Sequence, residues 1–303
     1  MTSKWNLAQA PTQPGRVAVV TGANTGLGYE TALELAKKGM MVVLACRNLA
    51  KAEAAQARII QAYPSAQVSC LPLDVSSLRS VGAFAAHFQQ QSKRLDLLIN
   101  NAGIMMPPQA VSEDRFELQL ATNYLGHFAL TGLLLPRLTG TPGSRVVSVS
   151  SLSYKWAEIS FNDLQAERGY SRRKAYGQSK RACLVFAYEL QRRLAAAGHG
   201  TRSVAAHPGL SKTNLDQYFP ALIRPLGGLF LQPAAQGALP LLYAALAPDI
   251  QGGEFIGPDG FQQMRGQPTR VDSDENSKDQ QVAARLWQAS EKLTGCYYLS
   301  GEK

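Results

Sequence analysis

The chain has 303 residues, of which 45% are hydrophobic and 17% are charged, the composition of a soluble globular protein with a sizeable core. This composition excludes a mainly disordered chain and a small disulfide-stapled scaffold. The formal net charge of +9 would suit an anionic partner. However, the densest basic cluster, Arg172-Arg173-Lys174 followed by Lys180-Arg181, lacks interleaved aromatic residues for stacking on bases. We therefore expect most of this charge to be solvated surface and expect no nucleic-acid partner.

Apolar runs of strand length alternate with helix-length amphipathic stretches over most of the chain. The runs predict strands at residues 17–20, 41–45, 68–73, 95–99, 145–149 and 203–206. Helices are expected at residues 30–38, 81–91, 125–135 and 181–197. A further Ala-rich helix is expected after the second strand, ending at Tyr63. Strands without in/out alternation have both faces covered, which implies a parallel sheet between two helical layers.

The sequence thus predicts the α/β class: a single doubly wound, Rossmann-type domain with about seven parallel strands. The expected domain spans residues 15–260, after an N-terminal extension of residues 1–14. In the C-terminal extension, residues 261–303, a polar loop at 265–278 and an amphipathic helix at 280–293 are expected to pack on the same domain.

The four cysteines, Cys46, Cys70, Cys183 and Cys296, lie far apart and have no metal-ligand spacing. They indicate reduced thiols, with Cys46 in the core, and no metal site. The N-terminus has no apolar leader region, and the longest strictly apolar run, residues 40–46, is far shorter than the roughly 18 residues of a membrane span. We expect a cytoplasmic protein.

A glycine-rich turn, Thr21-Gly22-Ala23-Asn24-Thr25-Gly26-Leu27-Gly28, joins the first strand to the first helix. Glycines let the backbone approach a pyrophosphate, and the helix N-terminus offers unpaired N–H groups. The GxxxGxG spacing differs from the common GxGxxG fingerprint, and a tight strand–helix connection is the alternative. Its place after the first strand favours a dinucleotide.

The second strand ends in Arg47, where an NAD-binding fold would present an acidic side chain to the adenosine ribose. A guanidinium can instead hold a 2′-phosphate with two hydrogen bonds. NADP(H) is therefore favoured over NAD(H), with a surface arginine as the alternative.

Two further motifs point to proton transfer. Ser150-Ser151 follows the fifth strand, and Tyr176 and Lys180 are four residues apart, on one face of a helix. Lowering a tyrosine pKa from about 10 to about 7 requires roughly 4 kcal/mol, which a neighbouring ammonium and a positive nicotinamide ring would supply.

Together with Asn100-Asn101-Ala102-Gly103 and His207-Pro208-Gly209, these motifs resemble, in order and spacing, those of the short-chain dehydrogenase/reductase superfamily. The resemblance implies that Tyr176 is the acid/base, that Lys180 tunes it, and that Ser151, next to Ser150, polarises the substrate carbonyl. It implies that Asn123 positions a water in the proton relay. The cofactor-binding residues it implies are Gly22, Asn24, Thr25, Gly26, Leu27, Gly28, Arg47, Asp74, Val75, Asn101, Ala102, Gly103, Tyr176, Lys180, Pro208, Gly209 and Thr213.

Finer features resemble the retinol dehydrogenase and WW-domain oxidoreductase branch: LACRN, NYLGHFALT and the filler Ser160–Gln165. That branch typically uses lipophilic carbonyls or alcohols, so we expect a lipophilic substrate, whether retinal-like, steroid-like or a long-chain aldehyde. The sequence departs from the branch in that we find no N-terminal membrane anchor and no WW module, so a retinoid substrate in particular does not follow. An apolar segment, residues 211–233, is expected to form a substrate lid, with core packing or a subunit contact as the alternative. Tyr154 and Trp156 are candidates for the pocket border, and His127 is expected to be a satisfied core histidine.

Two other functions remain open at this point. One is a dinucleotide-binding sensor or scaffold that has lost turnover, and the other is a protochlorophyllide reductase-like enzyme, which shares the NxLGHF and YxxxK patterns. The superfamily resemblance also implies a homodimer or homotetramer, formed through the helices that include residues 176–197.

Overall fold

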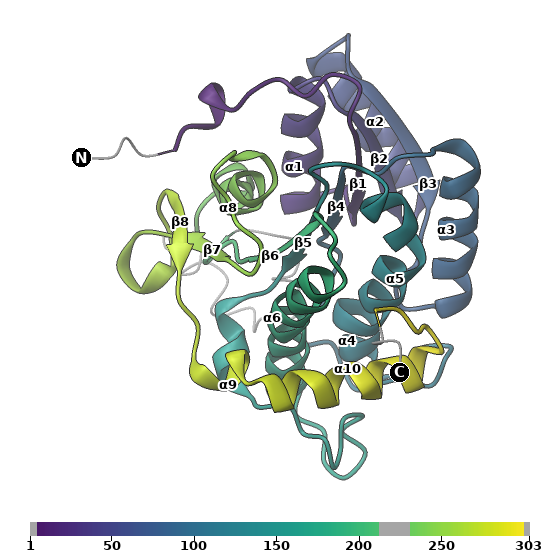
Figure 1. Ribbon diagram of the computed structural model, residues 1–303, viewed down its shortest axis with the longest axis vertical. Coiled ribbons are helices and arrows are strands. Elements are labelled where there is room, and N and C mark those ends of the chain that lie inside the picture. Colours follow the sequence, from purple (N-terminus) through teal and green to yellow (C-terminus); the bar gives the residue numbers. More distant parts are fainter. Residues whose placement is uncertain (1–4, 212–230, 300–303) are drawn as a thin grey trace.

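The computed structural model describes residues 5–211 and 231–299. A sheet of eight strands, in the order β3-β2-β1-β4-β5-β6-β7-β8, crosses the molecule (Figure 1). Strands β1 to β7 pair in parallel, and β8 pairs antiparallel with β7. The strands are β1 (Val17–Thr21), β2 (Met41–Cys46), β3 (Gln67–Pro72), β4 (Leu97–Asn100), β5 (Arg145–Val149), β6 (Arg202–Ala206), β7 (Phe255–Pro258) and β8 (Pro268–Val271). The predicted doubly wound parallel sheet is confirmed.

Helices cover both faces of this sheet (Figure 1). One layer comprises α1 (Gly26–Lys37), α2 (Leu49–Ala62) and α8 (Ala234–Leu246), and the other comprises α3 (Leu78–Gln91), α5 (Gly126–Thr139) and α6 (Arg172–Ala196). The short or peripheral helices are η1 (Leu7–Gln9), α4 (Leu118–Leu120), the π-helix η2 (Ala121–Leu125), η3 (Leu152–Trp156), η5 (Phe261–Gln263), α9 (Glu275–Lys278) and α10 (Gln280–Thr294).

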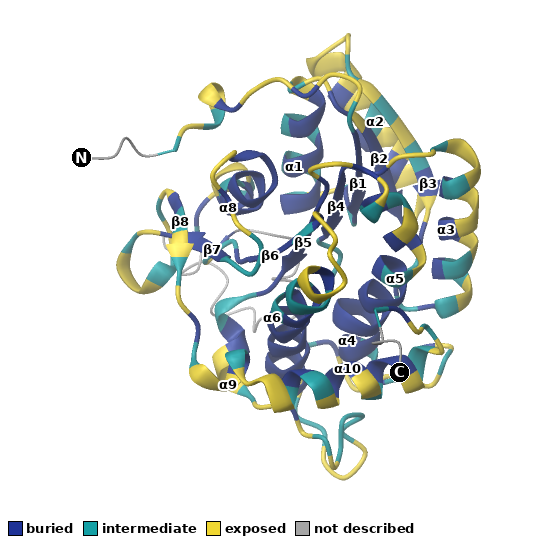
Figure 2. Ribbon diagram, viewed as in Figure 1, coloured by how far each residue is buried: buried dark blue, intermediate teal, exposed yellow. Residues whose placement is uncertain are grey.

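The central strands are buried on both faces, which is why they are apolar without alternation. Every residue of β1, β4 and β5 is buried, and α6 is buried along most of its length (Figure 2). The chain leaves β1 first toward β2 and β3 and later returns to β4 on the other side. This reversal opens a crevice at the carboxyl ends of the strands, where doubly wound folds bind their ligands.

The C-terminal part is more ordered than its polar sequence suggests. The expected loop at 265–278 contains strand β8 and helix α9. Strand β8 is only four residues long and lies at the sheet edge, so it needs no apolar alternation. The helix expected at residues 280–293 is confirmed as α10.

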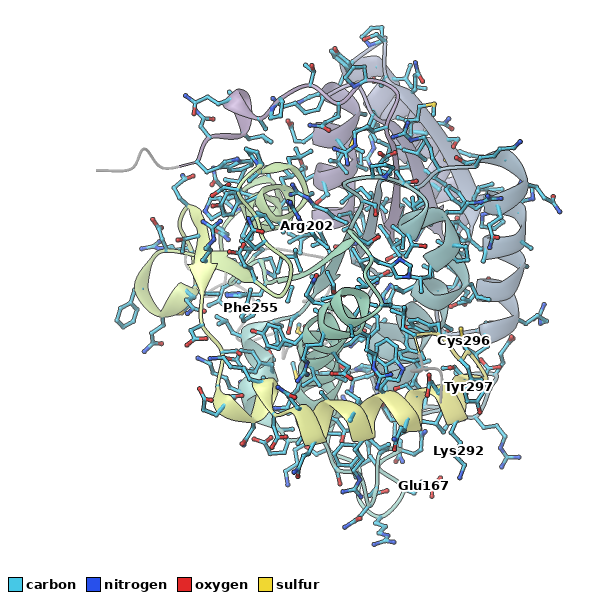
Figure 3. All side chains as sticks on the ribbon, viewed as in Figure 1. Glu167, Arg202, Phe255, Lys292, Cys296 and Tyr297 are labelled. Carbon is cyan, nitrogen blue, oxygen red and sulfur yellow. The ribbon has the colours of Figure 1, made fainter. Side chains whose placement is uncertain are left out.

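Helix α10 packs across α5 and α6 (Figure 1). The ring of Trp287, 1% exposed, lies 5.0 Å from that of Phe128 and 5.9 Å from that of Phe186. On its outer side Lys292 points away from the sheet, and the loop that carries Glu167 projects beyond the helix (Figure 3). In the described parts of the chain, no helix is both long and apolar enough to cross a bilayer.

An ion pair fastens this C-terminal part to α6. Arg181, 2% exposed, donates from Nη1 and Nη2 to the two carboxylate oxygens of Asp274, at 2.8 and 2.9 Å. Asp274 in turn caps α9 by accepting the N–H of Ser277. The sequence placed Arg181 in the densest basic cluster and predicted that most of the chain's charge is solvated surface. Arg181 departs from that prediction, because the partly exposed Asp274 carboxylate and the Ser277 hydroxyl replace the water around its buried guanidinium.

Candidate active site

The glycine-rich turn lies directly against the segment that follows β4. Gly22 and Gly26 have φ values of 67° and 57°, in the left-handed region that glycine adopts freely. A Cβ atom on Gly28 would lie 2.5 Å from both the Gly22 carbonyl oxygen and Asn101 Nδ2. The turn therefore requires glycine at these positions, and the fold brings the two predicted cofactor-binding motifs together.

This cradle fits a dinucleotide. Helix α1 begins at Gly26, so the unpaired N–H groups of its first turn, at Gly26, Leu27 and Gly28, face the carboxyl edge of the sheet. The predicted Asn24 and Thr25 lie in the same turn. Gly103 lines the other side, where a Cβ would lie 3.0 Å from Asn123 Oδ1 and 3.6 Å from Lys180 Nζ.

Arg47 and Asp74 lie together just beyond the carboxyl ends of β2 and β3. Arg47 follows β2, its side chain is 76% exposed, and its Nη1 atom lies 3.9 Å from Asp74 Oδ2. Asp74, followed by the buried Val75, also accepts hydrogen bonds from the N–H and hydroxyl of Ser76. The guanidinium therefore keeps donors available for an anion.

A second arginine near the turn was not singled out from the sequence. Arg58, on α2, donates from Nη2 to the Asn24 carbonyl oxygen at 3.3 Å and lies 4.3 Å from the centre of the Tyr29 ring. Nothing in the sequence separates Arg58 from the other basic residues, since its position follows only from how α2 packs beside α1.

Tyr176 and Lys180 lie on one face of α6, and both are buried. The helix begins at Arg172, earlier than the patterned stretch at 181–197, because Ser171 caps it by accepting the N–H of Lys174. Lys180 Nζ lies 5.9 Å from the centre of the Tyr176 ring and donates to the Val149 carbonyl oxygen at 3.0 Å. The strand-end carbonyl thus fixes the ammonium beside the phenol.

Burial dominates the acidity of this pair. It raises the pKa of Tyr176 to about 12, and a hydrogen bond with Ser151 acts in the opposite direction. Burial lowers the pKa of Lys180. In the free protein at neutral pH, Tyr176 is therefore a protonated phenol, able to donate a proton.

The two strand-end serines have different partners. Ser150 is buried and donates to the Lys180 carbonyl oxygen at 2.8 Å, which is a structural role. Ser151 bonds with Tyr176 and accepts the N–H of Ser153 at 3.2 Å. Of the two serines, Ser151 is therefore the one that lies at the phenol.

The two aromatic residues that follow the serines, Tyr154 and Trp156, also differ in their surroundings. The Trp156 ring centre lies 6.2 Å from that of Tyr176, and Trp156 is 37% exposed, so it borders the site. Tyr154 is 1% exposed and packs edge-on against Phe255. Tyr154 is therefore a core residue.

Asn123 lies in the π-helix η2, a form that is frequent at functional sites. Its side chain accepts the Ile104 N–H at 2.8 Å and donates to the Ile104 carbonyl oxygen at 3.0 Å and to Ser179 Oγ at 2.8 Å. Ser179 Oγ then donates to the Tyr176 carbonyl oxygen at 2.8 Å. Asn123 thereby links the cofactor-binding side of the crevice to the helix of Tyr176.

The segment after β6 is fixed on both sides. Gly209 has a φ of 66° and donates its N–H to His207 Nδ1 at 3.2 Å. The Pro208 carbonyl oxygen accepts hydrogen bonds from Gln232 Nε2 at 2.7 Å and Ser211 Oγ at 2.8 Å. The two ends of the expected lid, at Ser211 and Gln232, therefore meet, while Thr213 and the rest of residues 212–230 lie outside the described residues.

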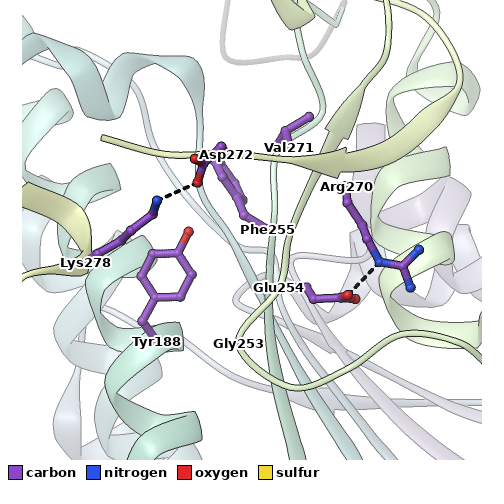
Figure 4. A pocket seen from close by; sticks show the side chains of 8 residues that line it. All are labelled: Tyr188, Gly253, Glu254, Phe255, Arg270, Val271, Asp272 and Lys278. Atoms are coloured by element: carbon purple, nitrogen blue, oxygen red, sulfur yellow. Dashed lines mark hydrogen bonds and ion pairs between the residues drawn. The ribbon is translucent and has the colours of Figure 1, made fainter. Parts of the chain in front are cut away.

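A separate cavity of about 240 Å³ lies between α6 and the β7–β8 hairpin (Figure 4). Its charged residues pair with one another: Lys278 Nζ lies 2.7 Å from Asp272 Oδ1, and Arg270 Nε lies 2.5 Å from Glu254 Oε1. None of the predicted site residues lines it. The candidate active site is the crevice at Tyr176 and the glycine turn.

Comparisons with known proteins agree with this geometry. The family model for short chain dehydrogenases matches residues 16–221. The chain is 39% identical to human retinol dehydrogenase 13 over 296 residues, covering 94% of this chain and 86% of that protein. It is 41% identical to human retinol dehydrogenase 12, covering 93% and 87%, and 40% identical to polyprenol dehydrogenase from Mus musculus, covering 94% and 85%.

Solved structures show the same fold. A crystal structure of an uncharacterized protein from Mycobacterium Paratuberculosis has a TM-score of 0.83 and 43% sequence identity, and the match covers 98% of this chain and 99% of that one. Levodione reductase, at 23% identity and a TM-score of 0.67, covers 82% of this chain and 98% of its own and shares the fold. From the matched family model and these relatives, the chain belongs to the short-chain dehydrogenase/reductase superfamily of oxidoreductases, in its retinol dehydrogenase branch.

Proposed function

We propose that this protein is an NADP(H)-dependent oxidoreductase that interconverts a carbonyl and an alcohol on a lipophilic substrate, with Tyr176 as the acid/base. The observation that carries the proposal is the arrangement of the buried Tyr176 phenol, hydrogen-bonded to Ser151 and lying beside Lys180, at the edge of a dinucleotide-shaped cradle.

The bound nicotinamide would supply the hydride in reduction and accept it in oxidation. In the reductive direction, the Tyr176 hydroxyl donates its proton to the substrate oxygen as the carbonyl carbon becomes saturated. Ser151 hydrogen-bonds the same oxygen and so stabilises the charge that develops there. Lys180 stabilises the phenolate that remains, because a positive charge nearby favours the ionised form of a phenol.

The preference for NADP(H) rests on Arg47. Its exposed guanidinium stands at the end of β2, where an adenosine ribose lies in doubly wound folds. Arg58, donating to the Asn24 carbonyl oxygen, adds a second positive charge near the same turn. Two arginines favour a cofactor that carries a 2′-phosphate.

The lipophilic substrate class is supported by the relatives and by one described side chain. Relatives of this chain include retinol dehydrogenases and a polyprenol dehydrogenase, which are named for hydrophobic alcohols. Trp156 offers a partly exposed aromatic surface next to Tyr176. An apolar wall beside a few polar groups is the usual composition of a small-molecule site.

The test is a fluorescence titration with NADPH and with NADH, followed by a panel of lipophilic aldehydes in the same samples. Tight, NADPH-selective binding and aldehyde-dependent loss of the cofactor signal are expected. Binding without turnover of any aldehyde or alcohol would favour the sensor or scaffold function, and failure to bind either cofactor would overturn the proposal.

A further inference from the structure

His127 is a buried histidine that the proposed reaction does not use. It is the second residue of α5, one turn after Asn123, and it is 3% exposed. Its ring lies between the end of β1 and the π-helix, and each ring nitrogen has one close polar neighbour. Those two neighbours determine where the ring carries its proton.

The proton lies on Nδ1. This nitrogen is 3.0 Å from the carbonyl oxygen of Asn123, which can only accept a hydrogen bond. Burial lowers the pKa of His127 to about 4, so the ring is neutral and has a single N–H. Nε2 is therefore an acceptor, and Thr21 Oγ1, at 2.9 Å, is its donor.

The Thr21 hydroxyl connects His127 to the segment after β4 that is predicted to bind the cofactor. Its hydroxyl oxygen accepts the backbone N–H groups of Asn101 and Ala102, both at 2.9 Å. Its own proton has two acceptors within reach, His127 Nε2 at 2.9 Å and the Ile99 carbonyl oxygen at 3.3 Å, of which the histidine is the closer. Donation to the histidine turns the lone pairs of the hydroxyl toward the two amides.

The ring needs these bonds to stay in one orientation. A cavity of about 10 Å³ lies beside it, lined by residues that include Asn100, Ser148 and Cys183. This void is no larger than one water molecule, so the ring is packed on most sides, and its two hydrogen bonds determine which ring nitrogen faces Thr21.

We propose that His127, protonated on Nδ1, is a positioning residue that ties the backbone of Asn123 to Thr21 and so fixes the cofactor-binding turn relative to the helix of Tyr176. The chain of hydrogen bonds runs from Asn101 and Ala102 through Thr21, His127 and Asn123 to Ser179 and the Tyr176 carbonyl oxygen. This role rests on the proposed oxidoreductase function, because it acts on the alignment of the two halves of that site.

The first experiment needs no variant and no substrate. Long-range ¹H–¹⁵N correlation spectra of the histidine-labelled protein report which ring nitrogen carries the proton. We expect His127 to show a protonated Nδ1 and a bare Nε2, unchanged between pH 8 and pH 5. A protonated Nε2 would overturn the proposal, whether or not a substrate has been found.

The second experiment compares two substitutions in NADPH-dependent reduction. His127→Asn keeps an N–H donor near the position of Nδ1, whereas His127→Phe keeps the ring and removes both hydrogen bonds. We expect kcat to fall by roughly 100-fold in H127F, the size expected for a misplacement of about 1 Å, with the KM for the carbonyl little changed. H127N should recover most of this loss.

Equal losses in the two variants, or full activity in H127F, would contradict the positioning role. If H127F does not fold, Thr21→Val replaces it, because valine has the shape of threonine but cannot donate to Nε2. T21V should lower kcat while its spectra still show the proton on Nδ1, and an unchanged kcat would contradict the proposal.

Discussion

The Lys180 ammonium lies 5.9 Å from the centre of the Tyr176 ring and is held there by the Val149 carbonyl oxygen, 3.0 Å away. The positive charge therefore lies near the phenol, while the hydrogen bond that holds the ammonium goes to the strand backbone. The phenol bonds with Ser151 instead, and that bond is the contact that lowers its pKa against the effect of burial.

This arrangement predicts opposite pH dependences for the two directions of the reaction. Reduction needs the Tyr176 phenol, whose pKa burial raises to about 12 in the free protein, so kcat/KM for reduction, which reports the free enzyme, should stay flat from pH 6 to pH 9. Oxidation needs the phenolate, so its kcat should rise about tenfold per pH unit below the pKa of the complex. Steady-state rates across this range measure both.

Ser151→Ala is the matched variant for these profiles. Without the serine hydrogen bond the phenolate loses a donor, so the pKa rises and the oxidative profile should move to higher pH. An oxidative profile that stays in place in S151A would show that this bond does not tune Tyr176.

Arg47→Asp should weaken NADPH binding roughly 10- to 100-fold more than NADH binding, the range expected when a charge-assisted hydrogen bond is lost. The measurement is a fluorescence titration with each cofactor. Arg79→Asp changes the net charge equally at an exposed position on α3, where it pairs with Glu113, and serves as the control. Equal losses for both cofactors in R47D would mean that Arg47 has only a structural role.

The buried histidines predict a loss of stability in weak acid. Burial lowers the pKa of His127 and of His207 from 6.5 to about 4. Below pH 6.5 the unfolded chain binds protons that the folded chain excludes, so stability is complete above pH 6.5 and is lost as the pH falls toward 4. The slope should approach about 1.4 kcal/mol per pH unit for each histidine.

Urea unfolding at pH 7, 6 and 5 measures this slope. His127→Asn removes one of the two histidines, so the dependence of the unfolding free energy on pH should become shallower by the contribution of one proton, about 1.4 kcal/mol per pH unit. A slope that is the same in the wild type and in H127N would show that His127 binds its proton equally well in the folded and unfolded chains.

The ion pair between Arg181 and Asp274 predicts that the C-terminal part stabilises α6. Asp274→Asn preserves shape but weakens one partner of a buried guanidinium. Because Asp274 is itself 38% exposed and Glu158 still pairs with Arg181, the free energy of unfolding should fall by about 1–2 kcal/mol. Lys278→Met removes only exposed ion pairs and should change little. Equal effects of D274N and K278M in urea unfolding would contradict this account.

The sequence was sufficient to predict the parallel sheet and most of the motifs because both depend on local chemistry. Buried strands must be apolar, and a pyrophosphate cradle requires glycine, so β1 and the turn at Gly22–Gly28 could be recognised directly. The YxxxK pair could be placed on a helix because a spacing of four residues has a fixed meaning there.

What the sequence could not predict depends on contacts between distant residues. Ser150 and Ser151 are chemically the same, and only the approach of α6 gives one to Lys180 and the other to Tyr176. From the sequence alone Arg181 looks like a surface residue, because its partner Asp274 lies far along the chain and only the fold brings the two together. His127 could be recognised as a core histidine, but its link to Thr21 required the strand and the helix together.

The most direct test of the account is Tyr176→Phe, which removes one hydroxyl and keeps the ring. Cofactor affinity and the reduction of a lipophilic aldehyde should be measured on the same preparation. The account predicts NADPH binding close to that of the wild type and a fall in kcat of about a thousandfold, the size of a lost general acid. Wild-type turnover by Y176F would contradict the central claim that Tyr176 moves the proton.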